Sequence, residues 1–192
     1  YYAAGVPWFA TLFGRDSIVA ALQMLPYNAA PAAQTLRVLA KYQGREHDPW
    51  REEEPGKIMH EIRVGELART GAVPHNPYYG TVDATPLFLI LAAQHHAWTA
   101  DDALIEELLP AIEAAGEWMR AGDRSSGYIT YASTSSRGLT NQGWKDSEDG
   151  VQHRDGSMAL PPIALVEVQA YAYRARMELA DLYLRIGQAK RS

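Results

Sequence analysis

Five stretches in which apolar residues recur at helical spacing constrain the fold of this chain more than any other feature. In the first stretch Ile18, Leu22 and Leu25 fall on one face, and Pro26 ends the helix. The predicted helices cover residues 16–25, 31–42, 84–98, 102–121 and 163–186. One short stretch, residues 128–131, has the β-branched and aromatic content of a strand. The sequence therefore predicts an all-α fold with at most a short β-hairpin.

Aspartate and proline mark several of the predicted helix ends. Asp16 stands at the start of one helical stretch and Asp83 precedes another, and both occupy positions at which an N-cap is expected. Pro31 stands in a first turn, where proline is tolerated. Pro110 lies inside the fourth stretch, so we expect it either to kink that helix or to begin a new one.

Two long connections separate the predicted helices and show no helical period. They cover residues 45–82 and 133–160 and are rich in glycine, proline and polar residues. Ordered loops of this length are usually functional. The chain has 192 residues, enough for one domain with a buried core. Because it begins without Met and ends in a basic tail, we expect residues 1–192 to be a single partial domain of a longer polypeptide.

Charge and composition argue against several classes of partner. The formal net charge is -5 and no Lys/Arg cluster stands out, so nucleic acid and anionic lipid are poor candidates. No run of eighteen apolar residues would span a membrane. The chain has no cysteine, and its histidines lack the spacing of a metal site. We therefore predict neither a metal nor another cofactor.

The loop at residues 138–150 is the most informative stretch for function. It places Asp146, Glu148 and Asp149 close to Trp144, between glycines. A carboxylic acid beside an apolar ring can protonate the leaving oxygen of a glycosidic bond, and an indole can stack on a sugar. The alternative is a solvated acidic loop in which the aspartates cap turns.

A second candidate stretch combines aromatic residues with an Arg-Asp pair. Trp8, Phe9 and Phe13 precede Arg15 and Asp16. Arginine and aspartate together present fixed donors and acceptors that suit sugar hydroxyls. The alternative is a helix cap next to a surface cation.

Two further candidates lie at predicted helix starts. Tyr78 and Tyr79 stand on a glycine-containing loop ahead of Asp83, and they suggest either a sugar platform or simple packing. Glu167 lies near the start of the last predicted helix. It is either an acceptor for sugar hydroxyls or an acidic residue that favours a first turn.

Four segments occur in an order that resembles the amylo-α-1,6-glucosidase (glycogen-debranching) type of glycoside hydrolase. They are Phe-Gly-Arg-Asp-Ser at 13–17, Gly-Thr-Val-Asp-Ala-Thr-Pro at 80–86, Asn-Gln-Gly-Trp-Lys-Asp-Ser at 141–147 and Glu-Val-Gln-Ala-Tyr at 167–171. The chain is more distantly similar to glucoamylases and trehalases. The resemblance covers nearly the whole chain, and the segment at 141–147 is its most specific part.

The resemblance implies part of an (α/α)6 barrel that hydrolyses α-linked glucose with inversion. It implies that Arg15 and Asp16 grip hydroxyls of the terminal glucose. The acidic loop then supplies the general acid, for which Asp146 is the first candidate, Asp149 the second and Glu148 the third. Inversion needs a second carboxylate about 6.5–9.5 Å from the first. In these relatives that base lies further along the polypeptide, so we expect the fragment to be inactive alone.

The same resemblance assigns the remaining site residues and the partners. Trp8, Tyr79, Asp83, Trp144 and Lys145 are expected to bind substrate along with Glu167. The expected partners are an oligosaccharide or polysaccharide and the remainder of the barrel. The start of the chain does not look like a signal peptide, which favours the cytoplasm.

Two alternatives belong to other functional classes. One is a related (α/α) barrel that cleaves the bond with phosphate or isomerises free sugars. The other is a non-catalytic helical scaffold that binds sugar. A phosphorylase has no catalytic base, so the residues beyond this chain distinguish the first alternative from the hydrolase.

Overall fold

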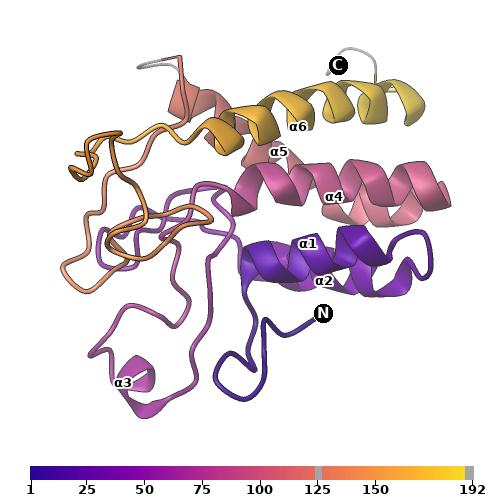
Figure 1. Cartoon of the computed structure of the whole chain (residues 1–192). Helices are drawn as coiled ribbons and strands as arrows, with labels where there is room; N and C mark the ends of the chain where they lie inside the picture. The colour runs from indigo at the N-terminus through magenta and orange to yellow at the C-terminus, as the bar shows by residue number, and fades with distance from the viewer. Residues whose placement is uncertain (124–126, 189–192) are drawn as a thin grey trace.

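The computed structural model describes residues 1–123 and 127–188, and helices dominate its regular structure (Figure 1). The helices are α1 (Gly14–Met24), α2 (Ala30–Lys41), α3 (Glu66–Arg69), α4 (Ala84–Thr99), α5 (Asp102–Asp123) and α6 (Val166–Arg185). Among the described residues, β-structure is limited to isolated bridges. The all-α prediction is confirmed, and each predicted helix corresponds to one of the five longer helices.

The differences from the predicted elements lie at caps and in loops. Phe13 occupies the N-cap position of α1, which puts Asp16 inside the first turn, so the N-cap prediction for Asp16 is wrong. The predicted strand at 128–131 is reduced to one bridge, between Tyr131 and Ile163. The helix α5 continues through Pro110 without a new start. The four-residue helix α3 was not predicted, since one turn is too short to show a period.

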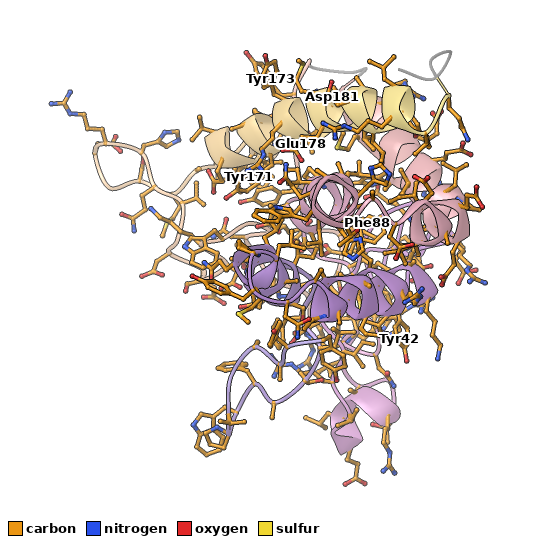
Figure 2. The ribbon with its side chains drawn as sticks, turned by 90° about the vertical axis from the view of Figure 1, so that its right-hand side faces the viewer. Tyr42, Phe88, Tyr171, Tyr173, Glu178 and Asp181 are labelled. Atoms are coloured by element: carbon orange, nitrogen blue, oxygen red, sulfur yellow. The ribbon has the colours of Figure 1, made fainter. Side chains whose placement is uncertain are left out.

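The helix α4 lies at the centre of the molecule. Its sequence is apolar around most of its circumference, and a helix of that kind is stable when other elements surround it. It contacts α1, α2, α5 and α6. Figure 2 shows it nearly end-on, with Phe88 among the side chains of its neighbours. The buried core extends from α4 to the inward faces of the other long helices.

The long helices form two sets that run in opposite directions (Figure 1). The helices α1, α4 and α6 run side by side in the same direction, and α2 and α5 run back behind them. The long loops gather at the end where α1, α4 and α6 begin. Residues far apart in the sequence therefore meet at this end of the bundle.

The helix α6 has an inward and an outward side. Figure 2 shows Tyr173 and Asp181 on the outer side and Tyr171 on the side nearer α4. Val168, Ala172 and Leu179 are buried against the core. Within residues 1–123 and 127–188, none of the helices combines the length and the apolar character that crossing a membrane requires.

Candidate functional site

Arg15 is the centre of the candidate site. It lies in the first turn of α1 and is 6% exposed. Its Nη1 atom is 2.8 Å from Oδ2 of Asp83, and its Nη2 atom is 3.4 Å from Oδ2 of Asp146. One guanidinium group therefore joins the start of α1, the start of α4 and the acidic loop.

A close approach of two backbone segments sets the position of Arg15. The amide of Gly14 donates to the carbonyl of His60, with a distance of 2.7 Å. A β-carbon at Gly14 would overlap the carbonyl oxygen of Met59. Glycine is therefore required here for α1 to begin against the 58–60 segment, and this contact fixes the position of the next residue, Arg15.

Asp83 holds Arg15 from the other side. It stands at the N-cap position of α4, as predicted, and it is fully buried. Its carboxylate accepts one hydrogen bond from Thr81 Oγ1 at 2.6 Å and one from Arg15 Nη1. Asp83 therefore ties α4 to α1 rather than capping its own helix. Burial opposes the charge of Arg15, but attraction to Asp83 outweighs it and raises the pKa of the guanidinium.

Trp144 and Asp146 cover the solvent side of Arg15. The guanidinium carbon of Arg15 is 5.4 Å from the centroid of the Trp144 ring, a cation–π distance. Trp144 is 63% exposed, and the side chain of Asp146 is 41% exposed. Both side chains are therefore accessible to a ligand, whereas Arg15 and Asp83 are buried beneath them.

Buried amide side chains hold the loop that carries Trp144 and Asp146. Asn141 Nδ2 donates to the carbonyl of Ser147 at 2.6 Å, and Asn141 Oδ1 accepts from Tyr131 Oη at 2.7 Å. The carbonyl of Gln142 accepts from the amide of Val82, the residue before Asp83, at 2.9 Å. The amide residues of the 141–147 segment are thus structural, and Trp144 and Asp146 are the residues that they present.

The start of α6 lies beside the cluster that Arg15, Asp83, Trp144 and Asp146 form. A β-carbon at Gly143 would overlap the side chain of Leu165, so the loop passes close to the residues that precede α6. Glu167 lies near this turn and is half-buried. Burial, followed by the charges of Asp83 and Glu167, raises the pKa of Tyr171. Tyr171 lies in the 167–171 segment near the start of α6, and we predicted no separate role for it.

A neutral histidine lies close to these charged groups. His60 is 3% exposed, and its ring stacks edge-on against Phe13 and Tyr78. Burial lowers its pKa, and the nearby positive charge of Arg15 lowers it further. Burial opposes ionisation of the next residue, Glu61, but hydrogen bonds from His75 and Arg63 lower its pKa. A neutral imidazole therefore lies near Arg15, and the carboxylate that follows it in the sequence is paired with His75 and Arg63.

Four predicted site residues lie away from the Arg15 cluster or point elsewhere. Trp8 is 85% exposed on the N-terminal loop and lines a separate groove of about 280 Å³. Tyr79 is buried and donates to the carbonyl of Tyr42 at 2.8 Å, which favours the packing interpretation. Lys145 and Asp149 are exposed on the acidic loop.

Asp16 and Glu148 complete the placement of the predicted residues. Asp16 is half-buried in the first turn of α1, and its negative charge acts on the neighbouring Arg15. Glu148 is exposed, and its backbone carbonyl lies 3.4 Å from Asn141 Nδ2. Of the three acidic candidates in the loop, Asp146 is the one that the structure places against Arg15. Among the described residues, no group of three His, Asp or Glu side chains could hold a metal ion.

Glu52 is a buried carboxylate for which we predicted no role from the sequence. It stands in a run of three glutamates within the 45–82 loop, a pattern that is typical of a solvated surface. It is nevertheless 5% exposed. Its neighbours Pro55 and Gly56, and the absence of any helical period around it, were the available signs of a structured turn.

Comparison with models of known protein families finds no match for this chain. A comparison with curated protein sequences finds none either.

Proposed function

We propose that this chain is part of the catalytic domain of a glycoside hydrolase that acts on α-linked glucose, of the amylo-α-1,6-glucosidase type. The observation that carries the proposal is the meeting of Arg15, Asp83, Trp144 and Asp146 at one end of the helix bundle. These residues come from three parts of the sequence, each of which carries one of the resembling motifs. If each residue only capped its own helix or turn, they would be scattered.

The chemistry of the cluster suits a neutral sugar. The buried pair of Arg15 and Asp83 holds a guanidinium group in a fixed orientation beneath Trp144 and Asp146. The exposed indole of Trp144 offers an apolar face on which a pyranose ring can stack. Asp146 is accessible to solvent, as a group that donates a proton to a leaving oxygen must be.

The arrangement of helices is consistent with part of an (α/α)6 barrel. One set of parallel helices, α1, α4 and α6, is joined through return helices, α2 and α5, and the long loops gather at one end (Figure 1). In a barrel of this type that end carries the active site. We propose that further helical hairpins complete the barrel and supply the catalytic base.

Asp83 is a poor candidate for that base. Its carboxylate is fully buried and already accepts hydrogen bonds from Arg15 and Thr81. A base that activates water needs a free oxygen on the sugar-binding surface. In the proposed mechanism Asp83 holds Arg15, Arg15 and Trp144 orient the glucose, and Asp146 protonates the departing oxygen.

The direct test is hydrolysis of α-glucosides by the protein expressed from its own gene. Proton NMR of the first product identifies the anomer, and inversion predicts that β-glucose appears before mutarotation. Phosphate is left out of one assay and added to a second. Turnover that requires phosphate and yields a sugar phosphate would identify a phosphorylase instead.

A binding experiment tests the site without catalysis. A glucose-like inhibitor that approaches Trp144 is expected to change tryptophan fluorescence, and the change should be lost in Trp144→Ala. Arg15→Lys should weaken binding by tenfold or more, because lysine cannot keep the planar, forked donor geometry. Unchanged binding in both variants would contradict the proposed site.

A further inference from the structure

The buried carboxylate of Glu52 accepts five hydrogen bonds. Its Oε2 atom accepts from Tyr78 Oη at 2.6 Å and from Gln142 Nε2 at 2.8 Å. Its Oε1 atom accepts from Ser133 Oγ at 2.9 Å and from the amides of Thr134 at 2.6 Å and Ser135 at 3.2 Å. A buried carboxylate is costly unless it is paired and hydrogen-bonded, and here five donors supply that compensation.

The backbone around Glu52 has an unusual conformation. Glu52 has a φ of 55°, in the left-handed region that non-glycine residues rarely adopt. Its backbone carbonyl accepts from Lys57 Nζ at 3.2 Å, which ties this turn to the adjacent segment. Strained residues persist where surrounding contacts determine them, and they concentrate at functional sites. Contacts of both its backbone carbonyl and its carboxylate hold Glu52 in this conformation.

The five donors come from two segments that lead to the candidate site. Tyr78 lies five residues before Asp83, and Gln142 lies four residues before Asp146. Tyr78 Oη also accepts from the amide of Leu139 at 2.7 Å, so the tyrosine bridges the two segments beside Glu52. A β-carbon at either Gly80 or Gly138 would overlap the Tyr78 hydroxyl, so glycine at both positions makes room for this bridge.

We propose that Glu52 is a positioning residue that fixes the loop carrying Trp144 and Asp146 against the segment leading to Asp83. The inference rests on the proposed function, because it makes Glu52 responsible for the placement of the general acid. In this role Glu52 contacts neither the sugar nor a reacting atom and is not a catalytic residue. It acts through Gln142, whose own carbonyl bonds to Val82 beside Asp83. The separation between Asp146 and Arg15 depends on this connection.

The first experiment measures activity in Glu52→Gln. The amide turns an NH2 group toward donors, so the ring of five hydrogen bonds cannot be kept. A displacement of the acid by about 1 Å can cost on the order of 10²-fold in rate. We expect kcat on a natural α-glucoside to fall by about that factor, with a much smaller loss on α-glucosyl fluoride, whose leaving group needs little protonation. Asp146→Asn should show the same dependence on the leaving group.

Glu54→Gln is the matched control. Glu54 belongs to the same acidic run, but its carboxylate binds Lys57 Nζ at 3.0 Å and Trp118 Nε1 at 3.0 Å, outside the 133–142 loop. We expect its rates on both substrates to stay within about twofold of the unaltered protein, too small a change for a lost catalytic interaction. A merely structural role for Glu52 would lower both rates of Glu52→Gln by the same factor, through loss of folded protein. That result, or no loss at all, would overturn the inference.

Amide hydrogen exchange tests the connection without activity. In Glu52→Gln the amides of Thr134, Ser135, Leu139 and Val82 should exchange faster, while those of α4 keep their protection. If exchange at these amides is unchanged, or rises uniformly through the protein, the inference is wrong. If the unaltered protein turns over no α-glucoside but the local exchange changes as expected, the proposed function fails while the structural connection stands.

Tyr78→Phe serves if Glu52→Gln does not fold. It removes the hydroxyl that joins Glu52 to Leu139 and leaves the carboxylate its other donors. The same dependence on the leaving group is expected, with a smaller loss. Equal losses on both substrates would again contradict a positioning role.

Discussion

Arg15 and Asp83 form a buried ion pair between the starts of α1 and α4, with Nη1 and Oδ2 2.8 Å apart. The two residues are 68 positions apart in the sequence, and both side chains are almost completely withdrawn from solvent. The pair fixes the relative position of two helices. Arg15 of this pair also contacts Trp144 and Asp146.

Breaking this pair should destabilise the fold strongly. In Asp83→Asn the guanidinium of Arg15 stays buried without its main counter-charge, and such losses cost about 3–5 kcal/mol. Urea denaturation measures the change in the free energy of unfolding. The control is Glu107→Gln, which breaks the solvent-exposed pair with Arg37 and should leave the free energy of unfolding unchanged within error. Equal effects of the two variants would show that burial of the Arg15 pair is not what matters.

Two glycines in helices predict opposite responses to alanine. Gly14→Ala gains helix propensity but places a methyl group on the carbonyl oxygen of Met59, so we expect a net loss of stability. Gly116, within α5, has open space around the position of a β-carbon. Gly116→Ala should therefore raise the free energy of unfolding by about 0.5–1 kcal/mol. Thermal melts of both variants measure this difference, and a stabilising Gly14→Ala would contradict the close approach described for α1.

The sequence predicted the long helices because their apolar period reports directly on the core. The helix α4 illustrates this, since its continuous apolar run already indicates a helix surrounded by others. Caps were harder to predict. Asp16 and Asp83 look alike in the sequence, yet one lies inside a helix and the other bonds across the core to Arg15. Local propensity cannot reveal which long-range partner a side chain will find.

Site residues that belong to a recognisable sequence motif were predictable. A residue that is buried only through long-range contacts of the fold was not. Arg15, Trp144 and Asp146 lie in segments that resemble a known family, and the structure brings them together. Glu52 stands in an acidic run of the kind usually solvated, and its burial depends on donors 26 to 90 residues away. The two tyrosines at 78 and 79 were equally ambiguous, because packing and sugar binding use the same residue type.

The free energy of unfolding should decrease as the pH falls, because buried His60 is harder to protonate in the folded protein than in the unfolded chain. Burial holds its pKa below the ordinary value of 6.5, so in that window the unfolded chain binds more protons than the folded one. The free energy of unfolding should therefore decrease as the pH drops below about 6.5, by at most about 1.4 kcal/mol per pH unit for one proton. Below the folded pKa this loss stops.

Urea denaturation between pH 7.5 and about 5 measures this slope, taking His60→Gln against the unaltered protein. The variant should lose part of the slope, while His95, whose pKa burial also lowers, keeps the rest. His153→Gln changes an exposed histidine of the 133–160 loop and is the control. Glu61 affects stability only at lower pH. Its folded pKa lies below 4.5, so its contribution to stability is lost as the pH falls through the folded pKa. An unaltered slope in His60→Gln would show that His60 is not the group responsible.

The last prediction separates Asp146 from Asp149 as the general acid, in the protein expressed from its own gene. Asp146 lies 3.4 Å from Arg15 Nη2, whereas Asp149 is exposed further along the loop. Asp146→Asn keeps the size of the side chain but removes the proton donor, so the rate on a natural α-glucoside should fall by about 10²–10⁴-fold. The loss on α-glucosyl fluoride should be much smaller, and inhibitor binding should change little because Arg15 and Trp144 remain. Asp149→Asn should lose less on the natural substrate. If Asp149→Asn instead shows the large loss that depends on the leaving group, the acid is Asp149, and the contact with Arg15 gives Asp146 a binding role. If neither variant affects the rate, the loop is a solvated acidic turn and the glycosidase proposal for it must be given up.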